Sequence, residues 1–293
     1  MILFGATGML GQAIAAEGRR RGRAVTGVSR HGPDRVADLA AFATIRPLLE
    51  EAAPDLVVNA AAIADIDACE RDPQRALAVN ARAVLAMAEY CRDAAIPLVQ
   101  ISTDHFFTGN GAAPHGELAP VALVNEYARS KFLGEGFAGI APRALVVRTN
   151  VTGFRNSAGR PTFVEWAMDA LERRAPLALF DDFYSSTIDT PSFARALFDL
   201  IERGAAGTIN LGSRTVASKW RFIHRLARMM EITLDWDEAA SVHSLAVPRA
   251  ESLGLDVGKA EGLLGYTLPD TDQVCRNLVS QRVGKRCAIP LAS

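Results

Sequence analysis

The sequence lacks an excess of charge of either sign: Lys and Arg total 32 and Asp and Glu total 33 among 293 residues. A net charge of -1 provides no field that would attract the chain to the phosphates of nucleic acid or to an anionic membrane surface. Uninterrupted apolar runs fall well short of the ~20 residues that a helix needs to cross a bilayer. We therefore expect neither nucleic acid nor a membrane as a partner.

Cysteine is also scarce, and its spacing carries no metal or disulfide signature. The four cysteines lie far apart without a CxxC pair, which predicts neither a disulfide framework nor a zinc site; they are Cys69, Cys91, Cys275 and Cys287. This usage suits a reducing compartment, so we expect a cytoplasmic protein without a metal centre. The apolar residues 1–4 have no basic leader and run into a glycine-rich turn, which predicts a first strand rather than an export signal.

The composition provides ample material for a core, since 49% of the residues are hydrophobic and 22% are charged. Short apolar runs alternate with longer stretches of helical period, the pattern of βα units in a parallel sheet. Strands are expected at residues 1–4, 24–29, 56–59, 98–102 and 144–148, and helices at residues 9–21, 42–51, 73–94 and 126–137. The expected fold class is α/β, with a Rossmann-type, doubly wound parallel sheet.

The pattern becomes less regular after about residue 150. A polar loop at residues 153–161 precedes expected helices at residues 163–174, 192–202 and 219–230 and expected strands at residues 177–180 and 208–211. We predict a nucleotide-binding domain at residues 1–150 and a smaller substrate-binding lobe at residues 151–293, with residues 187–210 as a candidate for returning to the first domain. The crevice between the two is the expected site.

A glycine-rich turn joins the first expected strand to the first expected helix. Gly5, Gly8 and Gly11 have the spacing GxxGxxG. Glycines here permit a tight turn and close approach of the backbone to a pyrophosphate, and the helix N-terminus offers free N–H groups to the anion. Plain strand-to-helix turns contain such clusters too, but the position at the start of a βα pattern favours a dinucleotide site.

The end of the second expected strand bears on which dinucleotide binds. It carries Ser29 and Arg30 and no carboxylate that would hold the adenosine ribose hydroxyls. A hydroxyl and a guanidinium suit a 2'-phosphate, so NADP(H) is favoured and NAD(H) remains possible. The alternative, that Arg30 is a solvated surface residue, stays open.

Two further segments carry chemistry. Tyr127 and Lys131 are four residues apart, hence on one face of a helix, and Thr103 follows an expected strand. A lysine charge is expected to lower the pKa of the phenol from its usual ~10, so that Tyr127 protonates a carbonyl oxygen as hydride arrives at carbon. Thr103 would orient that oxygen, and Lys131 would also hold the nicotinamide ribose. Alone, the spacing YxxxK is common in ordinary amphipathic helices.

The motifs taken together resemble the extended short-chain dehydrogenase/reductase superfamily, and within it the dTDP-4-dehydrorhamnose reductase family. The resemblance covers nearly the whole chain and is carried by the glycine turn and by residues 59–62, 65, 67, 70, 79–81, 101–109, 126–135, 148–149, 248–249, 264–265 and 268–269.

That resemblance implies NADPH-dependent reduction of the 4-keto group of a nucleoside-diphosphate deoxysugar. It assigns catalysis to Thr103, Tyr127 and Lys131. Two of these, Tyr127 and Lys131, are also implied in cofactor binding. The other residues implied in cofactor binding are Gly5, Thr7, Gly8, Met9, Leu10, Gly11, Ser29, Arg30, Asp38, Leu39, Asn59, Ala60, Ala61 and Asn80. Those implied in substrate binding are Asp104, His105, Phe106 and Asn150.

The sequence departs from the family pattern where substrate is chosen. His105 replaces an aromatic residue, Thr108 replaces an acid, and Asn150 follows the Arg-Thr pair without the tryptophan often found soon after it. A loop histidine is also common at surfaces, so a substrate contact by His105 is one of two alternatives. Two other functions stay open: a sugar-nucleotide epimerase or dehydratase that retains NAD, and a non-catalytic, nucleotide-sensing regulatory subunit. A homodimer is possible.

Overall fold

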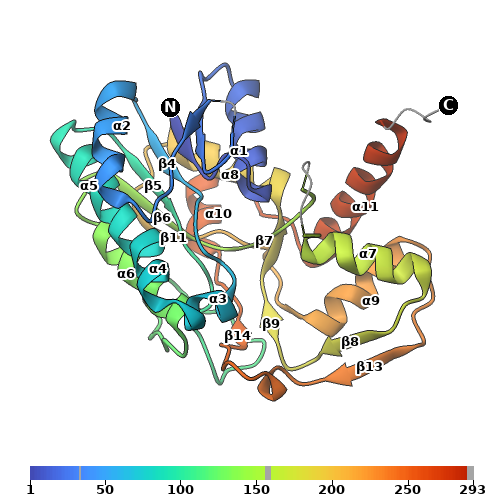
Figure 1. Ribbon diagram of the computed structural model, residues 1–293. Helices are drawn as coiled ribbons and strands as arrows, with labels where there is room; N and C mark the ends of the chain where they lie inside the picture. Colours follow the sequence, from blue (N-terminus) through green and yellow to red (C-terminus); the bar gives the residue numbers. More distant parts are fainter. Residues whose placement is uncertain (33, 156–159, 289–293) are drawn as a thin grey trace.

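A seven-stranded, fully parallel sheet forms the centre of the protein (Figure 1). The computed structural model describes the backbone of residues 1–32, 34–155 and 160–288. In spatial order the strands are β11 (Gly207–Asn210), β6 (Ala144–Arg148), β5 (Leu98–Ile101), β4 (Val57–Asn59), β1 (Ile2–Phe4), β2 (Thr26–Ser29) and β3 (Arg35–Val36). The predicted α/β class with a doubly wound parallel sheet is confirmed.

The inner strands β1, β4, β5 and β6 are mostly apolar and buried, as is typical of parallel strands with helices on both faces of the sheet. Successive side chains alternate between two cores: Leu3 and Val58 enter one, whereas Ile2 and Val57 enter the other. The first core lies under α1 (Met9–Arg20), α8 (Thr190–Glu202) and α10 (Gly258–Leu264). The second lies under α2 (Ile45–Ala52), α5 (Ala83–Asp93) and the end of α6 (Glu126–Ala138).

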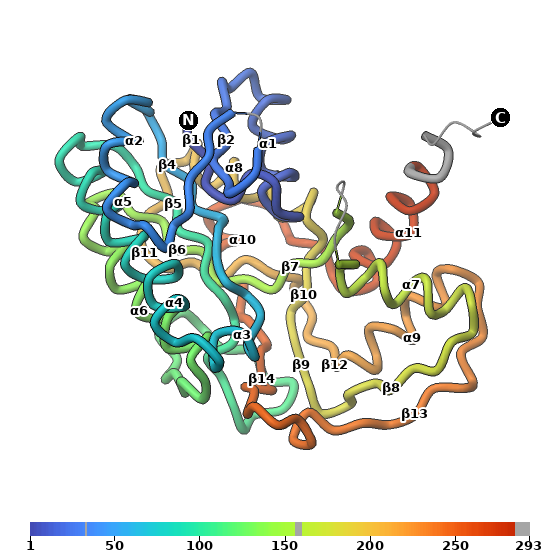
Figure 2. The backbone as a smooth tube through the Cα atoms, in the orientation of Figure 1, coloured from blue at the N-terminus to red at the C-terminus, as the bar shows by residue number. Residues whose placement is uncertain are grey.

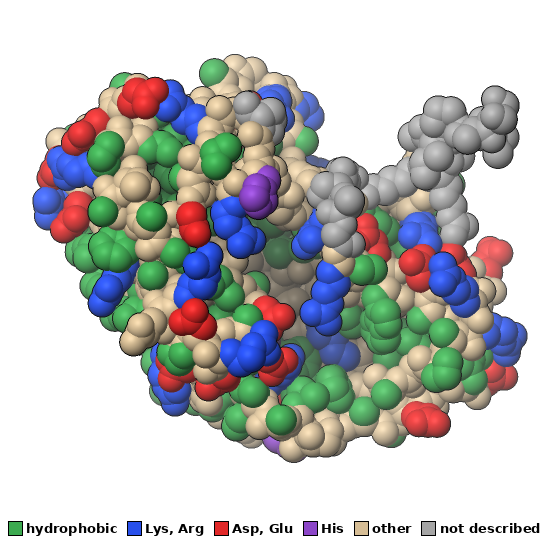
Figure 3. Space-filling model, viewed as in Figure 1, with side chains coloured by type: hydrophobic (Ala, Val, Ile, Leu, Met, Phe, Trp, Pro, Cys, Tyr) green, Lys and Arg blue, Asp and Glu red, His purple; other side chains and the backbone are tan. Residues whose placement is uncertain are grey.

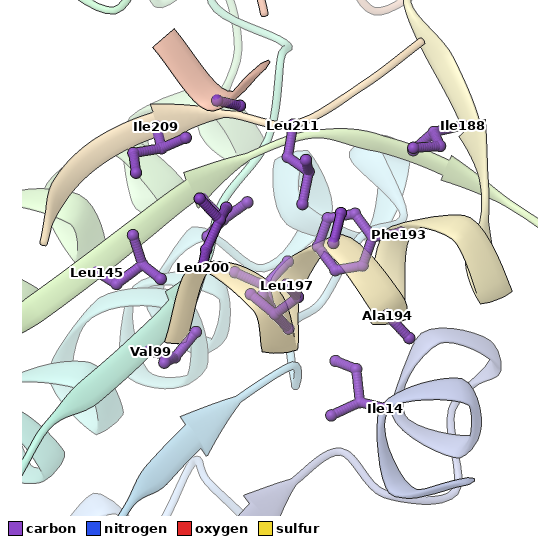
Figure 4. Packing of buried hydrophobic residues seen from close by; sticks show 14 of the residues in the cluster. Ile14, Val99, Leu145, Ile188, Phe193, Ala194, Leu197, Leu200, Ile209 and Leu211 are labelled. Atoms are coloured by element: carbon purple, nitrogen blue, oxygen red, sulfur yellow. The ribbon is translucent and has the colours of Figure 1, made fainter. Parts of the chain in front are cut away.

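The first core joins segments far apart in the sequence. Figure 4 shows Val99 and Leu145 of the sheet pointing toward Leu200 of α8, and Ile14 of α1 close to Ala194 of the same helix. Leu255 and Leu268 also belong to this core. The chain therefore returns to the main sheet twice after residue 150, through α8 and β11 and again through the segment around α10 (Figure 2).

The helix expected at residues 73–94 is interrupted. It consists of α4 (Pro73–Leu77), a π-helical turn (Ala78–Arg82) and α5, and it is preceded by α3 (Ile66–Arg71). Within the widened turn, the Asn80 side chain accepts from Ile63 N–H at 2.8 Å and donates to Ser130 Oγ at 3.0 Å. A Cβ on Gly134 of α6 would lie 2.3 Å from the Asn80 carbonyl oxygen. The wider turn thus coincides with the closest approach of α6.

The second lobe has its own core, between helices and a two-stranded sheet. Its elements are α7 (Phe163–Arg173), β8 (Leu177–Phe180), α9 (Lys219–Met229), β13 (Asp237–Ala240) and α11 (Thr271–Ala288). Short strands connect the lobes in two further small sheets; they are β7 (Asn150–Thr152), β9 (Tyr184–Ser185), β10 (Thr187–Asp189), β12 (Ala217–Ser218) and β14 (Ser252–Leu253). Short 3-10 turns occur at Phe42–Thr44 and Val242–Ser244. Among the described helices, none has the length and apolar character needed to span a bilayer.

Candidate active site

A pocket of about 1090 Å³ opens at the carboxyl ends of β1, β2 and β4. We call it the sheet-edge pocket. This volume slightly exceeds the ~300–1,000 Å³ typical of small-molecule sites. Its wall is formed by the segments that follow β1, β2 and β4. The strand order reverses between β1 and β4, and ligands of doubly wound sheets bind at such a switch point.

The glycine turn lets the backbone fold tightly against this pocket. Gly5 has a φ of +80°, and a Cβ there would lie 2.8 Å from Ala61 N. A Cβ on Gly11 would lie 2.0 Å from the Gly5 carbonyl oxygen. At the N-terminus of α1, Gly8 provides no side-chain cap, whereas Asn125 accepts from Ala128 N–H at the start of α6. The first N–H groups of α1 are therefore available to an anion.

Nine of the residues predicted to bind a cofactor line the sheet-edge pocket: Gly5, Thr7, Gly8, Ser29, Arg30, Asp38, Leu39, Ala60 and Ala61. Seven other predicted residues are not part of its lining; Tyr127 and Lys131 belong to the cluster described below, and the remaining five lie on or near the elements that form the wall. Met9, Leu10 and Gly11 form the first turn of α1, and Leu10 packs into the first core. Asn59 is buried and donates to Gln100 Oε1 at 2.8 Å, and Asn80 supports the α6 crossing.

Arg75 is a pocket residue that the sequence analysis missed. Its guanidinium lies 3.1 Å from Asp38 Oδ2, and both residues line the pocket. The Ala40 N–H and the Arg75 charge hold the pKa of Asp38 below its ordinary value, despite some burial. No periodicity or motif pairs a residue of α4 with a loop after β3, so only the folded chain reveals this contact.

The three predicted catalytic residues come together in a buried cluster. Tyr127 and Lys131 lie on α6, and Thr103 follows β5; all three are buried. The Lys131 ammonium donates to the Ile101 carbonyl oxygen at 2.7 Å. Tyr127 packs with Ile63, which also lines the sheet-edge pocket. The cluster therefore adjoins the pocket at the ends of β4 and β5.

The electrostatic prediction for this cluster is wrong. Burial raises the pKa of the Tyr127 phenol above its ordinary value, and a hydrogen bond with Thr103 opposes this shift only in part. Burial also lowers the pKa of Lys131 to about 8, against the opposing influence of Glu135. Removal of solvent outweighs the lysine charge, so the phenol keeps its proton at neutral pH.

The predicted substrate residues divide into two groups. Asp104 is fully buried, and its Oδ2 accepts from Asn150 Nδ2 at 2.9 Å. The His105 ring meets the Tyr127 ring edge-on, with 5.6 Å between ring centres, and burial lowers the pKa of His105 to about 3. Phe106 lies elsewhere: it is fully buried in the first core, with the Phe132 ring 5.6 Å away. Phe106 thus packs into the core, and its predicted contact with substrate stays a prediction.

The second lobe contributes charged side chains that the sequence analysis did not identify. Lys219, the first residue of α9, places its ammonium 4.7 Å from the centre of the Phe163 ring and 5.5 Å from that of Phe183. Figure 3 shows Lys and Arg side chains around the hollow between the lobes. In residues 1–32, 34–155 and 160–288, no cluster of three His, Cys, Asp or Glu side chains is arranged to hold a metal ion.

Comparisons with known proteins agree with this architecture. The family model described as the RmlD substrate binding domain matches residues 1–263. A probable low-salt glycan biosynthesis reductase of Haloferax volcanii is 30% identical over 277 residues, which are 90% of this chain and 92% of that protein. The dTDP-4-dehydrorhamnose reductase of Streptomyces griseus is 32% identical over 213 residues, 72% of this chain and 68% of that protein.

Solved structures show the same fold. A dTDP-4-dehydrorhamnose reductase from Clostridium acetobutylicum superposes with a TM-score of 0.85 at 21% identity, covering 96% of this chain and 99% of that one. The enzyme of that name from Bacillus anthracis, solved in complex with NADP, gives 0.84 at 20% identity and covers 96% and 97% of the two chains. The resemblance drawn from the sequence motifs is confirmed, and the chain belongs to the RmlD substrate binding domain family.

Proposed function

We propose that the protein is an NADPH-dependent reductase that transfers hydride to the 4-keto group of a nucleoside-diphosphate deoxysugar. The observation that carries this proposal is the buried cluster of Thr103, Tyr127 and Lys131 beside a pocket of dinucleotide size. The names of two relatives support the substrate class. One is the dTDP-4-dehydrorhamnose reductase of Streptomyces griseus, and the other is the dTDP-4-keto-6-deoxy-D-glucose reductase of Streptomyces niveus, which is 28% identical over 230 residues.

The residues of the sheet-edge pocket fit a dinucleotide. The uncapped N-terminus of α1 and the absence of a side chain at Gly5 suit a pyrophosphate, and Ser29 and Arg30 suit a 2'-phosphate. The NADP complex of the Bacillus anthracis relative supports the same choice, and NAD remains possible because a UDP-glucose-4-epimerase of similar fold was solved with NAD bound. When bound, the reduced nicotinamide supplies the hydride.

In this proposal Tyr127 acts as the proton donor. Burial keeps its phenol protonated, which is the form needed to quench the alkoxide that develops as hydride arrives. Thr103 donates a hydrogen bond that orients the carbonyl oxygen. Lys131 uses one N–H on Ile101 and has two more with which to hold ribose hydroxyls. Asp104, His105 and Asn150 would form the substrate side.

We also propose that residues 1–150, with residues 187–210 returning, bind the cofactor and that residues 151–293 supply the substrate lobe. The position of β11 in the main sheet supports the return. A cytoplasmic location is proposed because Cys69, Cys91 and Cys275 are buried free thiols. A homodimer is also proposed, and its test is the molar mass in solution.

The test is a panel of dTDP, UDP and GDP 4-keto sugars, followed by NADPH absorbance. Wild type is expected to consume NADPH with at least one sugar, and Tyr127→Phe to lower kcat by about 10²- to 10⁴-fold. Tyr90→Phe is the matched control, because Tyr90 is a buried tyrosine on α5, outside the cluster, and should turn over like wild type.

Two results would contradict the proposal. A protein that retains tightly bound NAD and isomerises sugar nucleotides without consuming NADPH is an epimerase. Unchanged turnover by Tyr127→Phe on every accepted sugar removes the proposed proton donor.

A further inference from the structure

Lys219 occupies a fixed position at the boundary between the lobes. It is the first residue of α9, and its backbone N–H donates to the Phe183 carbonyl oxygen at 3.0 Å. The preceding residue, Ser218, caps the helix by accepting from Arg221 N–H and also donates to Asp181 Oδ1 at 2.8 Å. The start of the helix is thus tied to the 181–183 segment, which limits where the Lys219 side chain can extend.

The ammonium of Lys219 lacks a protein partner for its hydrogens. Across the described residues, its Nζ makes no hydrogen bond and has no carboxylate oxygen within 4.0 Å. The rings of Phe163 and Phe183 both lie close to the ammonium, and they attract the charge without accepting its N–H groups as a phosphate or carboxylate would. An ammonium with three unused donors in a partly desolvated place is strongly disposed to bind an oxygen ligand.

The side chains around Lys219 leave its charge incompletely balanced. Its acidic neighbour is Asp104, which also accepts a hydrogen bond from Asn150. The two charges stabilise each other, while burial raises the pKa of Asp104 and lowers that of Lys219 to about 8, so an anionic ligand would stabilise the ammonium further. Lys219 and Arg249 both disfavour the protonated form of His105, so two cations act on one neutral ring. The wall therefore favours an anion.

A line of rings connects this cation to the proposed proton donor. The Phe183 ring centre lies 6.0 Å from that of His105, and the His105 ring centre lies 5.6 Å from that of Tyr127. In a nucleotide sugar, the sugar ring separates a 4-keto carbon from the diphosphate on the anomeric carbon. A cation for that diphosphate therefore belongs on the far side of the sugar from Tyr127, and the Phe183 and His105 rings follow one another between Lys219 and Tyr127.

We propose that Lys219 binds the substrate's diphosphate at the phosphate attached to the sugar, while His105 and Phe183 cover the sugar between Lys219 and Tyr127. This inference rests on the proposed function for the placement of the sugar. It adds a specificity-determining residue from the second lobe, and it selects substrates whose anomeric carbon carries a phosphate over free keto sugars.

The test is direct binding of dTDP, UDP and GDP to wild type and to Lys219→Met, measured by calorimetry. Methionine preserves most of the apolar stem and removes the charge. The expected result is a rise of about 10- to 100-fold in the Kd of whichever diphosphate wild type binds, with the Kd of NADPH unchanged. Lys219→Arg should recover part of the affinity. Lys259→Met is the matched control, because Lys259 Nζ donates to Thr208 O on a different element and should leave every Kd unchanged.

Each outcome decides the matter. If Lys219→Met binds the diphosphate as tightly as wild type does, the inference is overturned. If that variant also has a raised KM for the keto sugar, the ammonium contacts the sugar itself and not the diphosphate. If Lys219→Met does not fold, as judged by circular dichroism, Lys219→Gln replaces it. Wild type that binds a diphosphate through Lys219 but reduces no keto sugar contradicts the proposed function and leaves this inference standing. Wild type that binds no diphosphate contradicts both.

Discussion

Glu135 lies on the same helix as Tyr127 and Lys131 and forms a buried ion pair with Arg148 of β6. Arg148 Nε donates to Glu135 Oε1 at 2.9 Å, and Nη2 donates to Oε2 at 2.7 Å. The two side chains are only 7% and 6% exposed, so water cannot replace either partner. We predict that Glu135→Gln destabilises the protein strongly although it preserves the shape of the side chain.

The magnitude follows from leaving one charge buried alone. Removing one partner of a buried ion pair costs about 3–5 kcal/mol. Domains have a typical free energy of unfolding of about 5–15 kcal/mol, so this change is a large fraction of the total. A domain of 150–250 residues loses about 2–4 °C of Tm per kcal/mol, and we therefore expect a decrease on the order of 6–20 °C.

The assay is urea and thermal unfolding followed by circular dichroism. The matched control is Glu50→Gln, which breaks the Arg46–Glu50 pair on α2, where the side chains are 45% and 55% exposed. That variant should lose no more than about 0.5 kcal/mol. If Glu135→Gln unfolds within about 1 kcal/mol of the control, the pair does not carry the stability that its burial implies. The double variant Glu135→Leu with Arg148→Met should recover much of the loss, because no charge then stays buried.

Three further predictions concern the sheet-edge pocket and the residues beside it. Arg30→Ala should weaken NADPH binding about tenfold or more and leave NADH binding unchanged, as measured by fluorescence titration; equal losses would remove its role at a 2'-phosphate. The pKa of Lys131 is about 8, so its ammonium is present below that pH and lost above it. NADPH affinity should therefore fall as pH rises through about 8, and a pH profile that persists in Lys131→Met would contradict this assignment. Gly11→Ala places a methyl group 2.0 Å from the Gly5 carbonyl oxygen and should impair folding and NADPH binding, whereas Gly136→Ala, with no atom within 4 Å, should behave as wild type.

The main sheet was predictable because its strands record burial in their own residues. The 56–59 and 144–148 runs are almost continuously apolar, and the observed strands are β4 (Val57–Asn59) and β6 (Ala144–Arg148). Helix α6 was expected at residues 126–137 and is observed at Glu126–Ala138, so its start was predicted correctly and its end to within one residue. The grouping of Thr103 with Tyr127 and Lys131 followed from their places after β5 and on α6, which this sheet order brings together.

What the sequence did not reveal depends on contacts between distant segments. The strands β9, β12 and β14 are two residues each, too short for any hydrophobic period to appear. The Asp38–Arg75 pair in the pocket and the position of Lys219 over Phe163 and Phe183 join separate elements in the same way. The π-helical turn arises from the crossing of α6, which no local propensity encodes.

The wrong prediction for the pKa of Tyr127 bears on the proposed role of this residue as proton donor. Charge spacing alone favoured a phenolate, but burial shifts the pKa of Tyr127 upward and that of Lys131 downward, each toward its neutral form. A reductase needs the phenol, which still donates readily because an alkoxide is a much stronger base than a phenolate. The same burial strengthens the hydrogen bond from Thr103 to the developing charge. Burial of the cluster therefore stabilises the protonated phenol, which is the form that a proton donor needs.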